Sequence, residues 1–186
     1  VCSFFQSGSF LEFLSAVTGV PHMLADPYLD GAGIHSTGQG GFLAMHTDFN
    51  WSRQLQLHRR LNVLLYLNEH WQDEWNGHLI LSRHPSHQTA VQAINIAPRF
   101  NRLVVFNTND HTFHGQPVPL TCPSDYPRAS LAFYYYTRAN RPWPERLRLR
   151  ATTTRYVPLK DQRLAMHAAT RRQRLGYLMR RWIPFF

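Results

Sequence analysis

Short runs of β-branched and aromatic residues, separated by turn-forming residues, constrain the fold of this chain more than any other feature. Glycine, proline, asparagine and aspartate divide these runs, as they do between strands. Several short strands at nearly regular spacing are typical of an all-β barrel or jelly roll. We therefore expect a mainly β protein with strands at 41–46, 61–67, 78–82, 91–96, 102–106 and 130–137.

Two segments outside these runs have helical character. Ser9 and Glu12 form a capping-box pattern, and Gly19 and Pro21 would end the short apolar helix that it begins. Near the C-terminus, apolar residues recur at helical spacing from about residue 160 to 182, with arginines between them. We expect this basic amphipathic helix to pack its apolar stripe on the barrel.

These patterns divide the chain into two expected parts. Residues 1–140 form a jelly-roll domain, and residues 141–186 form a linker and the basic helix. The Gly-rich segment 26–41 is expected to be a loop that approaches the functional site, and the Pro-containing segment 138–158 an irregular connection. The chain begins without Met and without a charged-then-apolar leader, so we expect further residues upstream.

The net charge of +9 is distributed unevenly along the chain. Residues 1–137 contain 7 Lys and Arg against 9 Asp and Glu, whereas residues 138–186 contain 13 against 2. The basic character therefore belongs to the C-terminal part. Besides packing on the barrel, this tail could attract an acidic partner such as nucleic acid, or a membrane surface through Trp182, Phe185 and Phe186.

The cysteine count and the hydropathy pattern bear on the class of protein. Cys2 and Cys122 are too few for a disulfide framework and too far apart for a Cys-x-x-Cys metal site. We therefore expect reduced thiols in a cytoplasmic protein. The chain has no run of about 18 apolar residues, so we expect no transmembrane segment.

His46, Thr47 and Asp48 form the most chemically specific motif, and His114 and Arg128 follow it along the chain. Alternate residues of a strand point to the same face, so His46 and Asp48 can reach one ion. Two imidazoles and one carboxylate can occupy one face of a six-coordinate iron, as in non-haem Fe(II) oxygenases. A bare His-x-Asp pattern has a plainer explanation, which is a surface histidine beside a solvated aspartate. The guanidinium of Arg128 can bind a carboxylate bidentately and stays charged.

The ordered set of segments around these residues resembles the Fe(II)- and 2-oxoglutarate-dependent dioxygenases, in particular their prolyl 4-hydroxylase-like branch. The resemblance covers roughly residues 28–140 and lies in the segments 42–48, 60–68, 77–81, 98–106, 114–118 and 128–136. It implies a double-stranded β-helix (jelly-roll) core with flanking helices. It also implies an enzyme that hydroxylates an unactivated C–H bond and releases succinate and CO2.

The resemblance assigns catalytic and metal-binding roles to three residues. His46, Asp48 and His114 match the iron ligands of the family. His111 lies three residues before His114 and could replace it, but the sequence His-Gly-Gln-Pro-Val at 114–118 stands where the family has its distal ligand. The carboxylate of Asp48 favours hydroxylation, because halogenases of the superfamily lack it.

Three further residues are expected to bind the co-substrate. Arg128 matches the arginine that pairs with the C5 carboxylate of 2-oxoglutarate, and Tyr66 matches a tyrosine that hydrogen-bonds the same group. The plainer alternatives are a surface salt bridge for Arg128 and a core tyrosine for Tyr66. Ser130 lies two residues after Arg128, on the same face of the strand, and could assist. The implied cofactors are Fe(II), 2-oxoglutarate and O2, with ascorbate as a reductant, and the partner is a substrate peptide or small molecule.

The chain also departs from the family pattern. The family often has a Gly-Gly pair after the second strand, whereas this chain has Asn76 and Gly77. The interval between the histidine and the arginine is long and proline-rich, which predicts a reshaped substrate entrance. A nucleic-acid demethylase of the superfamily is an alternative, but that branch usually has a second arginine where this chain has Tyr134. A non-enzymatic cupin-like metal-binding module is another alternative, although it would not need both Asp48 and Arg128.

Overall fold

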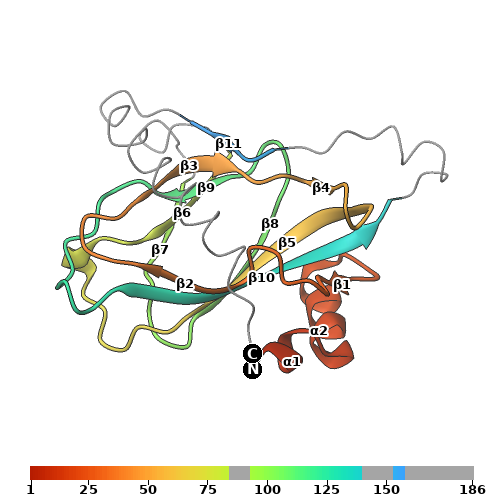
Figure 1. Ribbon diagram of the computed structural model, residues 1–186, viewed down its shortest axis with the longest axis horizontal. Helices are drawn as coiled ribbons and strands as arrows, with labels where there is room; N and C mark the ends of the chain where they lie inside the picture. Colours follow the sequence, from red (N-terminus) through yellow and green to blue (C-terminus); the bar gives the residue numbers. More distant parts are fainter. Residues whose placement is uncertain (84–92, 140–152, 158–186) are drawn as a thin grey trace.

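Two antiparallel β-sheets face each other in the computed structural model (Figure 1). The structure describes residues 1–83, 93–139 and 153–157. The larger sheet contains β1 (Leu24–Ala25), β2 (Gly33–Thr37), β4 (Trp51–Ser52), β5 (Leu57–Tyr66), β8 (Leu103–Asn107) and β10 (Arg128–Arg138). The smaller sheet contains β3 (Leu43–Thr47), β6 (Leu79–Ser82), β7 (Ile94–Ile96), β9 (Phe113–Gln116) and β11 (Arg155–Tyr156). This architecture confirms the predicted mainly β jelly roll.

The strand order positions the two longest strands, β5 and β10, at the centre of the larger sheet. In the larger sheet β10 lies beside β5, with β1 and β2 on the far side of β10 and with β4 and β8 on the far side of β5. The smaller sheet has the order β11, β3, β9, β6, β7. The interior position of β3 and β9 matters for function, because β3 carries His46 and leads directly to Asp48, and β9 carries His114.

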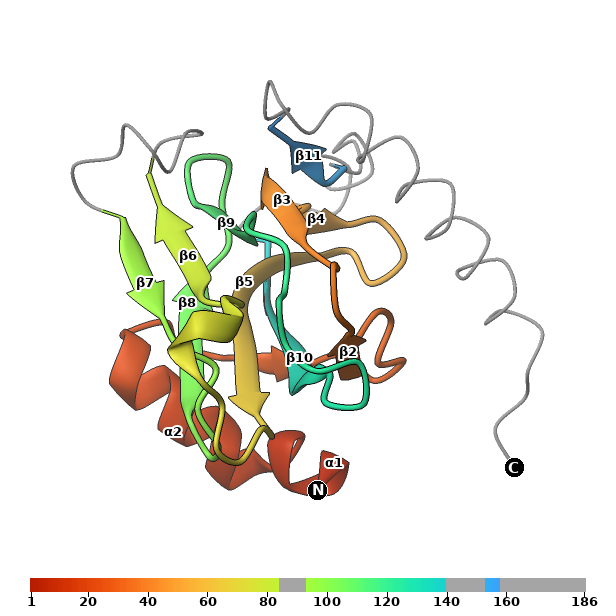
Figure 2. The same ribbon diagram turned by 90° about the vertical axis from the view of Figure 1, so that its left-hand side faces the viewer.

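Two helices cover the outer face of the larger sheet (Figures 1 and 2). They are α1 (Cys2–Phe5) and α2 (Gly8–Thr18), and a 3-10 helix, η1 (Asp73–Trp75), follows β5. The predicted helix is confirmed, but its cap is Ser7 rather than Ser9. The Ser7 side chain accepts a hydrogen bond from the backbone N–H of Phe10, and Ser9 lies inside the first turn. Gly19 ends the helix as predicted, with a φ of +69° that suits glycine.

The core between helices and sheet is largely aromatic. Phe5 stacks on Phe133 of β10 with 4.4 Å between ring centroids, and Leu14 of α2 is fully buried. Leu61 and Val63 of β5 belong to the same cluster. Burial of these side chains closes the outer face of the larger sheet, so the residues that alternate with them face the smaller sheet.

The structure corrects two expectations about irregular segments. The expected loop at 26–41 contains β2, which pairs with β10 so that Thr37 lies opposite Arg128. The expected linker at 138–158 contains β11, which pairs with β3. Neither strand was predicted from the sequence, because each pairs at the side of a sheet and contains few apolar residues. The predicted C-terminal helix lies outside the described residues, and the division of the chain near residue 140 stays a prediction.

Two other expectations concern the cysteines and the membrane. Cys2 and Cys122 are both free thiols, the first exposed and the second buried. Within the described part of the chain, no helix combines the length and the apolarity that a membrane span requires.

Close contact between β3 and β9 sets the geometry of the smaller sheet. His46 of β3 lies directly opposite His114 of β9. A Cβ atom on Gly115 would lie 2.8 Å from the carbonyl oxygen of Leu43 and 2.9 Å from that of Ala44. Because these atoms belong to the backbone, they cannot move aside without shifting the strand. The absence of a side chain at Gly115 therefore permits the two histidines to approach.

We expect Gly115→Ala to destabilise the protein by about 1–3 kcal/mol, because it overpacks the β3–β9 contact. Urea unfolding monitored by tryptophan fluorescence measures this change. Gly8→Ala is the matched control, since a Cβ at Gly8 meets nothing within 4 Å. Equal stability of the two variants would show that β3 and β9 can separate freely.

Candidate metal centre and co-substrate site

The structure brings the three predicted ligands, His46, Asp48 and His114, together. One ligand atom from each lies within 4.8 Å of the others. The Asp48 carboxylate is 3.6 Å from Nε2 of His46 and 3.4 Å from Nε2 of His114. His111 lies exposed in the turn before β9 and is not part of this group.

Local structure directs the imidazole of His46 toward this centre. Its Nδ1 lies 2.9 Å from the carbonyl oxygen of Ala44, so the proton on Nδ1 is donated to the backbone. That hydrogen bond leaves the lone pair of Nε2 facing Asp48 and His114, which is the arrangement that a metal ligand needs. Asp48 lies just beyond the end of β3 at Thr47, so the strand holds only the first member of the predicted pair.

Two residues that the sequence did not single out hold the Asp48 carboxylate. Arg59 donates from Nη2 to Oδ2 of Asp48 at 2.8 Å, and Asn62 donates from Nδ2 to the same oxygen at 2.7 Å. Arg59 also donates to the amide oxygen of Asn62, and its guanidinium lies 3.6 Å from the ring centroid of Tyr134. With Oδ2 engaged by two donors, the carboxylate keeps one orientation.

A β-bulge explains why Arg59 was missed. Residues three apart in a regular strand point to opposite faces of the sheet, so Arg59 and Asn62 would not be expected to meet. The register of β5 against β10 shifts between Tyr135 and Tyr136, and Arg60 is left without a partner on that side. This extra residue turns Arg59 to the same side as Asn62. No periodicity in the sequence marks this position.

Electrostatics fix the protonation of two of the three ligands. Burial raises the pKa of Asp48, but the adjacent His46 and the charge of Arg59 outweigh burial and hold that pKa well below its usual range. Burial, reinforced by the nearby His46, lowers the pKa of His114 to about 3. At neutral pH Asp48 is therefore a carboxylate and His114 a neutral imidazole. These are the forms in which the two side chains can ligate a metal.

The predicted co-substrate residues also lie together, on the inner face of the larger sheet. Arg128 and Ser130 are neighbours on one face of β10, and Ser130 lies opposite Tyr66 of β5. Arg128 donates from Nη2 to the Tyr66 hydroxyl at 2.9 Å and from Nε to the carbonyl oxygen of Gly77 at 2.7 Å. A Cβ on Gly77 would lie 3.2 Å from Cδ of Arg128, so glycine at 77 lets its backbone approach the arginine.

The charge of Arg128 has no internal counter-ion in the described part of the chain. Its side chain is buried, and its hydrogen-bond partners, Tyr66 and Gly77, are neutral. No described carboxylate forms an ion pair with it. Burial lowers its pKa, yet a guanidinium remains charged in proteins. A buried charge without a partner is costly, so this position suits an anionic ligand.

One more residue beside the metal centre was missed in the sequence. Tyr156 of β11 pairs with His46, and the two rings are 5.0 Å apart between centroids. The strand is fastened by a 2.7 Å hydrogen bond from the N–H of Val157 to the carbonyl oxygen of Met45, and by the ion pair of Arg155 with Asp110. Tyr156 therefore forms a wall of the centre on the β11 side. The sequence placed this residue in a linker and carried no signal of the pairing.

This fold and this group of side chains define a jelly-roll protein with a candidate non-haem metal site. The chain belongs to the 2OG-Fe(II) oxygenase superfamily, whose family model matches residues 32–136. The predicted superfamily is confirmed. No curated protein matches the chain.

The chain is similar to solved structures of prolyl hydroxylases. A prolyl 4-hydroxylase from Phytophthora capsici is 23% identical with a TM-score of 0.50, and the match covers 73% of this chain and 41% of that one. A prolyl-4-hydroxylase from Pseudomonas putida is 20% identical with a TM-score of 0.48, covering 76% and 68%. A Trichoplax adhaerens prolyl hydroxylase, solved with a hypoxia inducible factor peptide fragment, is 22% identical with a TM-score of 0.44, covering 64% and 46%. The chain thus spans about two fifths of the Phytophthora protein.

We expect the metal-free protein to lose stability as the pH falls from 6.5 toward 3. The pKa of His114 is about 3 in the folded protein against 6.5 for an unperturbed histidine, so in this range the unfolded chain binds a proton that the folded chain does not. The slope attributable to this residue is at most about 1.4 kcal/mol per pH unit. Urea unfolding at several pH values from 7 to 4.5 measures it. His114→Asn should flatten the slope, and His111→Asn should not; an unchanged slope in His114→Asn would contradict the assignment.

We expect Arg59→Gln to raise the pKa of Asp48 and to weaken Mn²⁺ binding by about 10–100-fold, as for loss of a group that orients a metal ligand. Isothermal titration with Mn²⁺ measures the affinity. Arg60→Gln is the control, because Arg60 is adjacent in sequence but exposed. If both variants bind Mn²⁺ as the unmodified protein does, Arg59 does not position Asp48.

Proposed function

We propose that this chain carries a hydroxylase site that uses Fe(II), 2-oxoglutarate and O2, with a prolyl-hydroxylase-like mode of action. The observation that carries the proposal is the combination of two features in one barrel. One is the group of His46, Asp48 and His114, and the other is the buried Arg128 without a counter-ion among the described residues. A metal site alone would fit many proteins, whereas the added unpaired guanidinium indicates a dicarboxylate ligand.

The donor set suits the proposed metal. One carboxylate and two imidazoles favour Fe(II) or Mn(II), and three protein ligands leave coordination positions for other molecules. We propose that His46 and His114 bind through Nε2 and that Asp48 binds through Oδ1, because Oδ2 already accepts from Arg59 and Asn62. When bound, iron and 2-oxoglutarate would supply oxidation of an unactivated C–H bond, with release of succinate and CO2.

Arg128, Tyr66 and Ser130 are proposed to hold the far carboxylate of 2-oxoglutarate. The Tyr66 hydroxyl accepts from Arg128, so its own proton is available for a carboxylate oxygen. Burial raises the pKa of Tyr66, which keeps that proton in place at neutral pH. Ser130 is almost fully buried beside them and offers a further O–H donor. A guanidinium with two hydroxyl donors matches the hydrogen-bonding needs of a carboxylate.

The family match favours an enzyme over a cupin-like binding module. The demethylase branch has its second arginine where this chain has Tyr134. The ring of Tyr134 packs against the Arg59 guanidinium. The substrate proposed here is therefore a peptide or small molecule with an accessible C–H bond. Ascorbate is the proposed reductant in the assay.

We expect the full chain to bind Mn²⁺ and 2-oxoglutarate, and with Fe(II), ascorbate and O2 to convert 2-oxoglutarate to succinate. Asp48→Ala should abolish Mn²⁺ binding. Arg128→Met should retain Mn²⁺ but weaken 2-oxoglutarate binding by at least about 30-fold, since losing one partner of a buried charge pair costs about 2 kcal/mol or more. Calorimetry measures the two affinities and mass spectrometry measures succinate.

Two exposed residues provide matched controls for these variants. His111→Ala tests the alternative histidine, and Arg99→Met removes an exposed arginine. Both should leave the two affinities unchanged. Failure of the unmodified protein to bind either ligand would overturn the proposed function, and loss of Mn²⁺ binding in His111→Ala would overturn the ligand assignment.

A further inference from the structure

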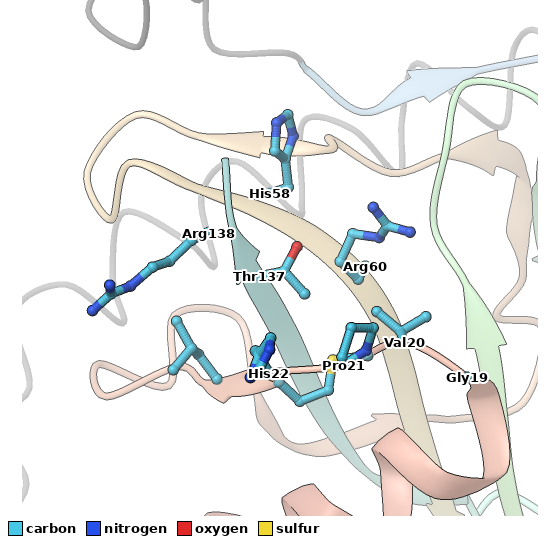
Figure 3. A pocket seen from close by; sticks show the side chains of 10 residues that line it. Gly19, Val20, Pro21, His22, His58, Arg60, Thr137 and Arg138 are labelled. Atoms are coloured by element: carbon cyan, nitrogen blue, oxygen red, sulfur yellow. The ribbon is translucent and has the colours of Figure 1, made fainter. Parts of the chain in front are cut away.

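Two adjoining cavities flank the first residues of β5, outside the group of candidate metal ligands. One has a volume of about 940 Å³ and lies between residues 19–24, which follow α2, and the ends of β5 and β10 (Figure 3). The other has a volume of about 440 Å³ and extends to residues 107–109. Val20, His58 and Arg60 line both cavities, so we treat them as one groove and call it the β5 groove.

The β5 groove is basic, although the domain around it is not. Arg60 and Arg138 are exposed, and His22 and His58 also line it. No Asp or Glu lines either cavity. Among the described residues, no carboxylate forms an ion pair with Arg60 or Arg138. Residues 1–138, which include both arginines, contain 8 Lys and Arg against 9 Asp and Glu, so this positive surface is a local arrangement rather than a result of composition.

The spacing of the two arginines indicates an elongated ligand. Thr137 lies opposite His58 in the pairing of β10 with β5, and Arg138 follows at the end of β10. Figure 3 shows Arg138 and Arg60 at opposite ends of the row of side chains, with Thr137 between them. A small anion would occupy one end of this row, whereas an extended chain with several carboxylates can contact both.

The remaining lining suits a peptide backbone better than a nucleic acid. Asn50, Asn107 and Asn109 line the smaller cavity. Asn50 donates to Asp110 and Asn109 accepts from the N–H of His111, so the amide of Asn107 and the Nδ2 of Asn109 are the groups we assign to a ligand backbone. Thr108 lines it too, and its hydroxyl is buried without a hydrogen-bond partner among the described residues. Neither cavity is lined by Phe, Tyr or Trp, so the groove has no aromatic platform on which bases could stack.

The groove reaches the candidate metal centre through Arg59. This residue lines the smaller cavity, and its Nη2 is 2.8 Å from Oδ2 of Asp48. Asn50 lies two residues beyond Asp48 in the chain and also lines the cavity. A molecule that fills this end of the groove is therefore separated from Asp48 by one side chain, that of Arg59.

We propose that the β5 groove binds an extended acidic peptide segment and thereby delivers a neighbouring residue of that peptide to the metal centre. Carboxylates of the peptide pair with Arg60 and Arg138, and its backbone groups pair with the asparagine amides and the Thr108 hydroxyl. Binding in the groove stands on the lining residues alone. Only the delivery of the peptide to the metal rests on the proposed function.

Fluorescence anisotropy of the full chain with a labelled Glu-rich decapeptide tests the proposal. Arg60→Glu combined with Arg138→Glu should weaken binding about tenfold or more, because both contacts become repulsive. Arg53→Glu is the matched control, since Arg53 is exposed and lines neither cavity, and it should leave affinity unchanged. No binding of the peptide, or equal binding by both variants, overturns the proposal.

A second variant tests the buried hydroxyl without risk to the fold. Thr108→Val should retain or increase stability, because it removes an unpaired buried polar group, and should weaken peptide binding about fivefold, as for one lost hydrogen bond. Unchanged affinity would remove Thr108 from the site. A Lys-rich decapeptide should not bind, and a single-stranded oligonucleotide that binds more tightly than the Glu-rich peptide would overturn the ligand class.

The same titrations separate this inference from the proposed function. Peptide binding is measured without turnover, in the unmodified protein and in His46→Ala. If the peptide binds both proteins but the unmodified protein binds neither Mn²⁺ nor 2-oxoglutarate, the groove proposal is supported and the proposed function is contradicted. If the cofactors bind and the peptide does not, only the groove proposal fails. Succinate release that increases with the Glu-rich peptide carrying one proline would support both parts.

Discussion

The close approach of β3 and β9 is the constraint on which the candidate metal centre depends. Their pairing sets His46 opposite His114, and only a residue without a side chain fits at Gly115 between the strand backbones. Both imidazoles are buried by this contact. Burial disfavours the charged form of His114, so the packing that creates the centre also prepares it for a cation. The same contact between β3 and β9 therefore both brings the two histidines together and buries them.

The larger sheet contributes charge rather than ligands. Its inner face presents two buried arginines with different surroundings. Arg59 is neutralised by Asp48 and rests on the Tyr134 ring, so it serves the metal side of the barrel. Arg128 has only the neutral partners Tyr66 and Gly77 within the described chain, which is why we assign it to a bound anion. Arg59, whose charge is paired with Asp48, therefore has a structural role. Arg128, whose charge has no carboxylate partner among the described residues, has the proposed binding role.

The β5 bulge directs one arginine toward the metal centre and the next toward the outer surface. By leaving Arg60 out of register, it turns Arg59 inward and places Arg60 in the groove outside. Bulges often lie beside active sites, where they change the direction of a side chain. Here one irregularity supplies both a positioning group for Asp48 and a cation for a ligand on the neighbouring surface.

The sequence by itself determined the jelly-roll class and singled out His46, Asp48 and His114, with His114 preferred over His111, because strand-forming runs and family motifs are local properties of the chain. Only the tertiary structure decided which groups support the site. Arg59 meets Asp48 through a bulge, and Tyr156 reaches His46 through an edge strand from over 100 residues away. Such contacts depend on register and long-range pairing, which no periodicity in the sequence records.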